Sequence, residues 1–153
     1  MRWQKRKTVG LFGIAALSLL MLLSGCEDSV PEAMYICRTD WLLQSLGPVG
    51  AETPVLEESR IELKFACDDT FGGTSGCNSY SGSFSALDTG EISIGATAMT
   101  EMACADPALM DQEARYIGAL IRISRFEREG DTLRLFYDNG QQNLYYAKCT
   151  DCD

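Results

Sequence analysis

The sequence contains no histidine, and its folded part has few basic residues. The absence of histidine excludes serine–histidine and cysteine–histidine catalysis, histidine general bases and most zinc or haem sites. Four of the 13 Lys and Arg residues lie before residue 8, whereas no acidic residue precedes Glu27. Residues 26–153 therefore carry nine basic and 22 acidic residues, a formal net charge of −13. A body this acidic argues against nucleic-acid binding, which needs a basic surface.

The first 25 residues have the order of segments of a secretory signal peptide. A basic segment, residues 1–8, precedes fifteen uncharged and mostly apolar residues, 9–23. This run falls short of the roughly 20 apolar residues that a membrane-spanning helix needs. The sequence Leu-Ser-Gly-Cys at 23–26 resembles the lipobox of bacterial lipoproteins, which implies cleavage before Cys26 and acylation of that residue, for example with palmitate. The alternative is an uncleaved signal anchor in which Cys26 is incidental.

The rest of the chain divides into a short tether and one domain. Residues 26–36 are polar, contain Pro31 and are expected to form a lipidated tether, while residues 37–153 form the domain. A tether of about ten residues reaches at most ~33 Å from the membrane. In Gram-negative lipoproteins, aspartate after the lipidated cysteine signals retention in the inner membrane. Glu27 therefore favours, by this resemblance, the outer membrane facing the periplasm.

Seven cysteines are present, and lipidation of Cys26 leaves six for the domain. In an exported protein, an even number of cysteines favours disulfides over metal ligands or free thiols. Only Cys149 and Cys152 have the spacing of a zinc ligand pair or a redox CxxC pair. The acidic residues on both sides of Cys152 favour a higher thiol pKa there, so a structural cross-link is preferred. We expect no metal and no cofactor. The six cysteines are Cys37, Cys67, Cys77, Cys104, Cys149 and Cys152.

Short strands divided by glycine-rich turns account for most of the domain. Residues 60–65 alternate apolar and polar side chains, which predicts a half-buried strand. The same parity predicts that Cys67 points inward unless the turn at 68–69 breaks the register. Asn139-Gly140 lies between two alternating runs and is a strong hairpin signal. An apolar run at 39–46 and a loop at 47–59 come first, a glycine-rich segment at 71–85 marks bulges and tight bends, and further strands are predicted at 91–94, 123–128, 132–137 and 141–147.

One segment has the pattern of a helix. Asp106 is a suitable N-cap, and Pro107 suits the first helical position. Apolar side chains then recur at spacings of three and four, which predicts a core-facing stripe rather than a cofactor site. The stripe consists of Leu109, Met110, Ala114, Ile117, Leu120 and Ile121.

Two motifs make the domain recognisable. Gly-Cys-Asn-Ser-Tyr-Ser-Gly at 76–82 and Thr-Ala-Met-Thr-Glu-Met-Ala-Cys at 97–104 resemble those of the META domain, the family of HslJ-like heat-shock lipoproteins. The resemblance covers about residues 39–147. It implies an α+β, mostly β fold: a strongly curved antiparallel meander like an incomplete barrel with one packed helix. It also implies a cell-envelope location, and it does not imply a catalytic activity. Further matching residues are Trp41-Leu42, Glu113, Tyr116 and Leu120, and the segment 130–135.

The resemblance also suggests one disulfide. Cys77 and Cys104 lie in the two motifs, and these segments are expected to lie side by side on the curved sheet, so we predict that the two cysteines pair. The four others would then tie the N-terminal segment and the Cys67 turn to the tail. Which of Cys149 and Cys152 joins Cys37 stays open, and an adjacent Cys149–Cys152 bridge is a further alternative.

Three polar motif residues are the candidates for a binding role: Asn78, Tyr80 and Thr100. In the structural interpretation, Asn78 bonds backbone groups at a bend and Tyr80 packs with its hydroxyl at the rim. In the functional interpretation, these side chains form the polar mouth of a barrel cavity. Ser75 and Ser79 have no histidine to activate them, which argues against nucleophilic catalysis.

Two functions from different classes fit these features. The preferred one is a membrane-anchored, non-catalytic interaction or structural module that supports the envelope under stress, with an envelope protein as partner. The alternative is a carrier that holds a lipid or another apolar ligand in the incomplete barrel. A thiol–disulfide enzyme using Cys149 and Cys152 is a distant third. A filled core with an exposed apolar patch would favour the first, and a continuous apolar cavity the second.

Overall fold

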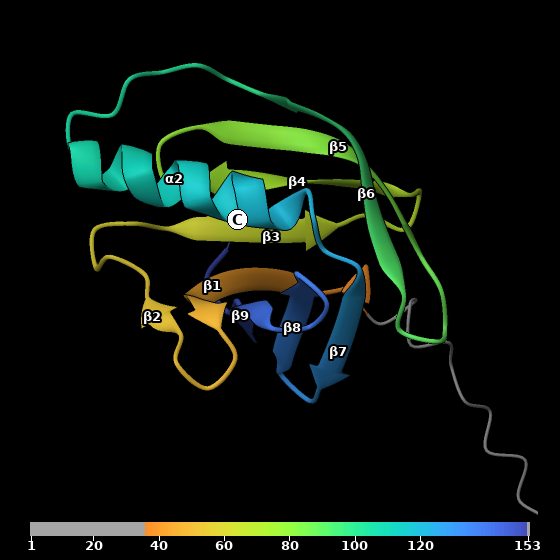
Figure 1. The fold of residues 1–153 in the computed structure, drawn as a ribbon. Coiled ribbons are helices and arrows are strands. Elements are labelled where there is room, and N and C mark those ends of the chain that lie inside the picture. The colour runs from red at the N-terminus through yellow and green to blue at the C-terminus, as the bar shows by residue number, and fades with distance from the viewer. Residues whose placement is uncertain (1–35, 153) are drawn as a thin grey trace, which may run out of the picture.

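One antiparallel sheet of nine strands curls into a half-barrel (Figure 1). The computed structural model describes residues 36–152, so the expected signal peptide, Cys26 and the tether up to residue 35 lie outside the described residues. The sheet order is β6-β5-β4-β3-β1-β9-β8-β7, with β2 paired to β1. The mostly β fold with one helix is confirmed. The strands are β1 (Asp40–Pro48), β2 (Thr53–Pro54), β3 (Ile61–Phe65), β4 (Thr70–Ser75), β5 (Ser79–Ala86), β6 (Ile92–Met99), β7 (Arg125–Glu129), β8 (Thr132–Tyr137) and β9 (Gln142–Lys148).

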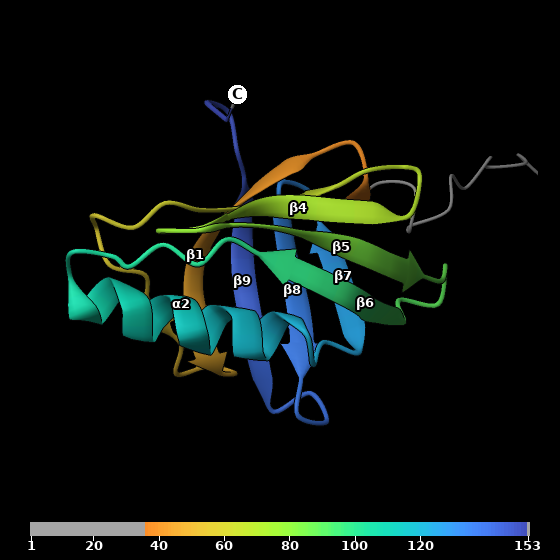
Figure 2. The ribbon, with the colours of Figure 1, turned by 90° about the horizontal axis from the view of Figure 1, so that it is seen from above.

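The two edge strands of the sheet meet near the start of β6. Glu91 and Arg125 form an isolated bridge there, and the Phe126 N–H donates to the Gly90 carbonyl at 2.8 Å. The helix α2 (Pro107–Leu120) lies across the open side of the curled sheet, and it contacts β4, β8 and β9 (Figure 2). The half-barrel is therefore closed at one corner by its own edges and elsewhere by the helix.

Sheet curvature depends on glycine where β4, β5 and β6 coil together. A Cβ atom on Gly82 would lie 2.5 Å from the Ala96 carbonyl oxygen and 2.7 Å from the Phe71 ring. The register of β5 against β6 also shifts between Gly82 and Phe84. Bulges of this kind bend a strand and increase its twist, as the glycine-rich sequence predicts.

The predicted strand alternation is confirmed in β3 but fails just after it. Ile61, Leu63 and Phe65 are buried, with exposed fractions of 1% or less. Cys67, by contrast, is exposed, because the chain leaves the strand in a turn in which Asp69 takes a positive φ of 64°. The turn at 68–69 thus breaks the register, which is the exception that the sequence left open for Cys67.

Strands extend further than the sequence pattern predicts in two places. The expected loop at 47–59 contains β2, which pairs with Ser45 and Leu46 of β1. The expected strand at 91–94 continues to Met99. Neither extension alternates apolar and polar side chains regularly, because its residues lie at the margin of the sheet and are mostly exposed. Backbone pairing rather than side-chain burial defines these segments.

The three strands predicted after the helix, and the Asn139-Gly140 hairpin between β8 and β9, are confirmed.

The helix begins as predicted but buries a different face. Asp106 is the N-cap, and its side chain accepts from the Ala108 N–H at 2.8 Å. Met110 and Ile121 of the predicted stripe are 41% and 51% exposed, and Ala114 is also exposed. Leu120 is fully buried, as predicted. The buried residues of α2 are Gln112, Glu113, Tyr116, Ala119 and Leu120.

Side chains fill the described interior of the half-barrel. The largest of them are aromatic, and the Phe65 and Phe84 rings pack with centroids 4.7 Å apart. The N-terminal side of the domain takes part as well: Ile36 is fully buried, and its carbonyl accepts from the Trp41 indole N–H at 3.3 Å. Ile36, which the sequence pattern assigns to the tether, therefore belongs to the core. None of the described helices is long and apolar enough to cross a membrane.

Candidate functional site

The motif residue Asn78 lies in a buried hydrogen-bond cluster with Glu113 of α2. Asn78 is 3% exposed and Glu113 is 4% exposed. The Asn78 side-chain amide donates to Glu113 Oε2 at 2.7 Å, and the Asn78 backbone N–H donates to Glu113 Oε1 at 2.9 Å. The Ser75 hydroxyl donates to the same Oε1. One carboxylate thus ties the turn between β4 and β5 to the helix.

The same asparagine holds the connection between β6 and α2. Asn78 Oδ1 accepts from the Thr100 hydroxyl at 2.8 Å and from the Met102 N–H at 2.7 Å. The Thr100 backbone N–H in turn donates to the Ser79 carbonyl at 3.0 Å. Asn78 and Thr100 therefore join the two motif segments to each other, and their polar atoms are used internally.

The Glu113 carboxylate is held in its charged form inside the protein. Burial raises the pKa of a carboxyl group, but the donors Ser75 and Asn78 outweigh that effect, and the pKa of Glu113 is lowered from its ordinary value. A buried charge is tolerated only when its oxygens are hydrogen-bonded. The cluster satisfies this requirement through the donors of Ser75 and Asn78, and it joins the helix to the sheet.

Tyr80 and two further tyrosines form a buried hydroxyl chain. The Tyr146 hydroxyl donates to the Tyr116 hydroxyl at 3.2 Å, and the Tyr116 and Tyr80 hydroxyls lie 2.6 Å apart. The Tyr80 hydroxyl donates to the Glu62 carbonyl at 2.7 Å. Burial raises the pKa of Tyr116 to about 12, and it also raises the pKa values of Tyr80 and Tyr146. All three are neutral at physiological pH, and the Tyr80 hydroxyl lies in the interior rather than at the rim.

Gly73 makes room for the end of this hydroxyl chain. A Cβ atom at Gly73 would lie 1.9 Å from the Glu62 carbonyl oxygen and 2.9 Å from the Tyr80 hydroxyl. Real Cβ atoms do not approach other atoms this closely, so any side chain at this position would break the contact. The hydrogen bond between Tyr80 and Glu62 therefore requires glycine at position 73.

The six described cysteines form three disulfides. Cys77 is bonded to Cys104, with Cα atoms 5.8 Å apart, which covalently links the two motif segments. Cys37 is bonded to Cys67, and Cys149 to Cys152. The expected link from the N-terminal segment to the tail is wrong, because the turn at Cys67 comes down beside Cys37. The alternative of an adjacent Cys149–Cys152 bridge is what the structure shows.

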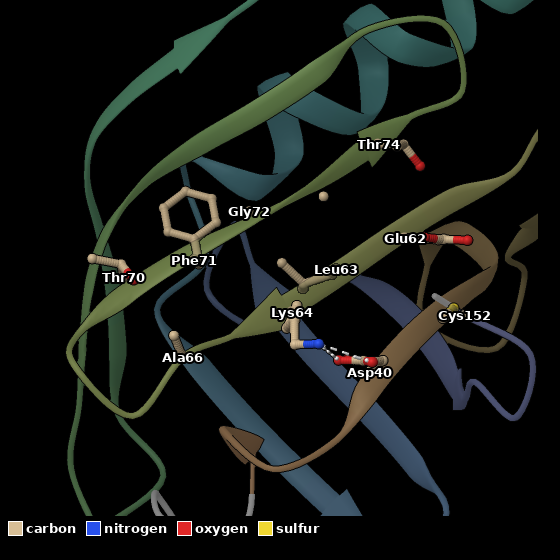
Figure 3. Close-up of a pocket in the computed structure, with 11 residues that line it drawn as sticks. Asp40, Glu62, Leu63, Lys64, Ala66, Thr70, Phe71, Gly72, Thr74 and Cys152 are labelled. Carbon is tan, nitrogen blue, oxygen red and sulfur yellow. Dashed lines mark hydrogen bonds and ion pairs between the residues drawn. The ribbon is translucent and has the colours of Figure 1, made fainter.

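A surface groove of about 450 Å³ lies on β3 and β4, beside the C-terminal tail (Figure 3). Lys64 and Asp40 form an ion pair at 3.0 Å on its wall. Gly72 lines it between the strands and Cys152 lines it from the tail, whereas the Leu63 and Phe71 side chains are buried in the core. No sequence pattern predicts this groove, because it is formed by segments that lie far apart in the chain.

The described residues hold no arrangement that fits ordinary hydrolytic catalysis. Ser75 contacts a carboxylate, but its side chain is 1% exposed and its hydroxyl is used in the Glu113 cluster. Within residues 36–152, no group of three or more Cys, Asp or Glu side chains could hold a metal ion. The motif residues are instead joined in a cluster that stabilises the domain.

Sequence reasoning missed the central position of two helix residues. Only the family resemblance singles out Glu113 in the sequence, and no pattern singles out Gln112. Gln112 is 6% exposed; its Oε1 accepts from the Leu56 N–H at 2.8 Å, and its Nε2 donates to the Ser59 hydroxyl at 2.6 Å. Apolar periodicity is blind to such residues, because they are buried through hydrogen bonds. Their spacing from Tyr116 and Leu120, which lie on the same helix face, was the available signal.

The fold and the cluster define a class: a helix-packed half-barrel in which two polar motifs and a disulfide fasten the helix connection to the sheet. The chain belongs to the META domain family, whose profile matches residues 34–149. This is not a known enzyme family. No curated protein sequence matches the chain.

Solved structures show the same fold. An NMR structure of a protein from Burkholderia xenovorans has 29% sequence identity and a TM-score of 0.64, covering 79% of this chain and 89% of that one. A second NMR structure has 24% identity and a TM-score of 0.58, covering 74% and 92%. A crystal structure of a DUF4847 family protein from Bacteroides vulgatus has 12% identity and a TM-score of 0.56, covering 74% and 94%.

Proposed function

We propose that this protein is a lipid-anchored envelope lipoprotein whose META domain is a non-catalytic interaction module. The observation that carries the proposal is the combination of a filled interior and an apolar outer face on α2. Met110 and Ile121 are 41% and 51% exposed, and Ala114 lies exposed between them at helical spacing. Exposed apolar side chains that share one face are typical of protein contact surfaces.

The methionines next to the helix extend this face. Met102, in the connection that Asn78 holds, is 60% exposed, and Met110 Sδ accepts from the Cys104 N–H at 3.3 Å. Methionine side chains adapt their shape to a partner more easily than branched ones do. Because Asn78 and the Cys77–Cys104 disulfide fix the connection, this face is rigid before a partner arrives, which lowers the entropic cost of binding.

The N-terminal sequence supports the proposal that this module lies at a membrane of the envelope. The basic, apolar and lipobox segments at 1–26 favour export and lipidation at Cys26, and the net charge of −13 for residues 26–153 argues against a nucleic-acid partner. A multiply acylated cysteine gives stable membrane attachment. A partner is therefore sought among envelope proteins close to the same membrane.

A photo-crosslinking residue placed on this face tests the proposal. Position 121 lies on the apolar face, and position 129 on the charged strand β7 is a matched exposed control. We expect a defined protein adduct in intact cells from position 121 and none from position 129, with the adduct identified by mass spectrometry. Equal labelling at both positions would contradict a specific contact surface.

Native mass spectrometry distinguishes the carrier alternative. The interior that a lipid would occupy holds Trp41, Phe65 and Tyr116, all with exposed fractions of 0%. A bound apolar ligand would therefore require these side chains to move. Recovery of a stoichiometric lipid with the domain purified from its own envelope would replace the interaction module with a carrier.

A further inference from the structure

The C-terminal tail carries a disulfide that the motif cluster does not use. Cys149 and Cys152 are bonded to each other directly after β9, and both are partly exposed. The Cys149 N–H donates to the Asp40 carbonyl at 2.7 Å, which fixes the tail beside the start of β1. The disulfide is thus held in place on the surface, and it closes a loop too short to contribute much to global stability.

A cation lies against both sulfur atoms of this bond. Arg60 Nη2 is 3.5 Å from Cys149 Sγ and 3.5 Å from Cys152 Sγ, and it donates to the Asp151 carbonyl at 3.1 Å. Arg60 also forms ion pairs with Glu62 and, at 3.4 Å, with Asp151, so these two carboxylates share the positive charge that stabilises a thiolate on either sulfur. The sequence alone favoured a raised pKa of the Cys152 thiol, because acidic residues flank it. The contact with Arg60, which acts in the opposite direction, is visible only in the structure.

The groove on β3 and β4 leads to one of these sulfurs. Cys152 lines the groove together with Glu62, Lys64 and Gly72 of the two strands (Figure 3). Gly72 has no side chain to fill the space, and the volume of about 450 Å³ accommodates a few residues of another chain. Cys149 does not line the groove, and the Asp151 carboxylate lies 3.5 Å from its sulfur, so Arg60 has to offset that carboxylate as well as a thiolate formed there. Cys152 is therefore the accessible end of the bond.

We propose that the Cys149–Cys152 pair is a thiol–disulfide exchange site for polypeptide dithiols. A thiolate of the partner attacks Cys152 Sγ, forms an intermolecular S–S bond and breaks the Cys149–Cys152 bond. The electron pair leaves on Cys149 Sγ, where Arg60 offsets the new charge. The second thiolate of the partner then attacks the partner's own sulfur in the mixed disulfide and releases Cys152.

The exchange balances without another reagent. The partner dithiol is oxidised to a disulfide by two electrons, Cys149 and Cys152 are reduced to thiols, and the two protons of the partner thiols end on these cysteines. The reverse reaction reduces a partner disulfide. The site is independent of the outer face of α2, so it stands or falls separately from the proposed function.

The other two disulfides of the chain serve as internal controls in the first experiment. The full-length protein is equilibrated with reduced and oxidised glutathione, quenched with an alkylating agent and mapped by peptide mass spectrometry. We expect Cys149–Cys152 to exchange at least ~10-fold faster than Cys37–Cys67 and Cys77–Cys104. Exchange no faster than that of the two other pairs would overturn the proposal.

Variants of the arginine test the mechanism. Arg60→Gln should slow reduction of the pair by glutathione about 3- to 10-fold and move the pH profile of the rate to higher pH, while Arg60→Lys should retain most of the rate. Arg125→Gln is the matched control, since Arg125 also forms an ion pair with a glutamate two residues further along the chain, Glu127. Unchanged or faster exchange in Arg60→Gln would show that Arg60 only shields the bond.

Single cysteine variants test which sulfur is attacked. Cys149→Ser leaves Cys152 free at the groove, and we expect it to form a mixed disulfide with oxidised glutathione faster than Cys149 does in Cys152→Ser. The reverse order would contradict attack at Cys152. Near-ultraviolet circular dichroism of each variant confirms that the fold is intact, since neither cysteine belongs to the core.

Discussion

At the scale of single residues, the buried carboxylate of Glu113 is the most constrained group in the domain. It accepts from Ser75 and from two donors of Asn78, and it has no cationic partner among the hydrogen bonds that hold it. Replacement by glutamine keeps the shape but turns one acceptor into a donor that faces the Asn78 amide. The structure therefore makes this carboxylate sensitive to both substitution and pH.

We expect Glu113→Gln to lower the free energy of unfolding by about 1–3 kcal/mol, because it leaves a buried donor without an acceptor. Urea denaturation monitored by fluorescence measures the change. Glu57→Gln, on the exposed segment before β3, is the control and should change the free energy by less than ~0.5 kcal/mol. A similar loss in both variants would contradict a special role for Glu113.

Stability should also depend on pH through the same group. The pKa of Glu113 is lowered in the folded protein, so its contribution is fully present above the ordinary value of 4.5 and is lost as the pH falls through the lower folded-state value. Denaturation curves between neutral pH and pH ~3 should therefore fall less steeply with pH for Glu113→Gln than for the unchanged protein. Parallel curves would show that Glu113 does not titrate in this range.

Two glycines of the domain give opposite predictions for the same substitution. Gly73→Ala should destabilise the domain by at least ~3 kcal/mol, because its Cβ would overlap the Glu62 carbonyl and displace the Tyr80 hydroxyl. Gly118 lies within α2, and a Cβ atom added there would have no atom within 4 Å beyond its chain neighbours and the backbone of its own helix, so Gly118→Ala should stabilise by about 0.5–1 kcal/mol. Thermal unfolding of both variants measures the difference, and a loss in both would contradict the packing described.

At the scale of elements, α2 has one face that is buried against the sheet, with Leu120, and another that is exposed, with Ile121. Leu120→Ala should cost about 2–5 kcal/mol, because Leu120 is fully buried. Ile121→Ala, one residue on, should cost less than ~1 kcal/mol, because Ile121 is 51% exposed. Chemical denaturation of the pair of variants gives both values. A reversed order would mean that α2 packs against the sheet through the face of Met110, Ala114 and Ile121.

The disulfides contribute to stability by linking segments of the chain, and the length of the linked segment sets the size of the contribution. Cys77–Cys104 closes a loop with a sequence separation of 27 and fastens the β6–α2 connection, and its double serine variant should lose about 3–4 kcal/mol. The double variant of Cys149 and Cys152, with a separation of 3, should lose only about 2 kcal/mol or less. Urea denaturation of the two double variants measures both losses. Equal losses would show that the motif disulfide adds nothing beyond a local link.

At the scale of the whole molecule, the proposed attachment to the membrane depends on a segment outside the described residues. Cys26→Ser should yield unprocessed or soluble protein, since the acylated sulfur is absent. An inhibitor of lipoprotein signal peptidase should make the precursor of the unchanged protein accumulate. Membrane fractionation and mass spectrometry of the N-terminus measure both, and normal maturation under the inhibitor would contradict the anchor.

The sequence by itself determined the local features whose causes are local. Alternation in residues 60–65 predicted β3, Asp106 and Pro107 predicted the start of α2, and Asn139-Gly140 predicted the last hairpin. The two motifs were sufficient for the fold class, because they resemble those of a family with a known architecture. Each of these features depends on neighbours in the chain, which a sequence shows directly.

Only the tertiary structure decided which faces and which distant groups meet. The helix packs with Glu113 and Tyr116 inward because the sheet offers hydrogen-bond partners there. The periodicity of apolar residues does not record the stability that these hydrogen bonds contribute. Cys67 turned outward and met Cys37 because a positive-φ residue, Asp69, broke the strand parity. Arg60 reached the tail disulfide because the sheet places β3 and the end of β9 on either side of β1. Such contacts arise from three-dimensional proximity, which no spacing along the chain records.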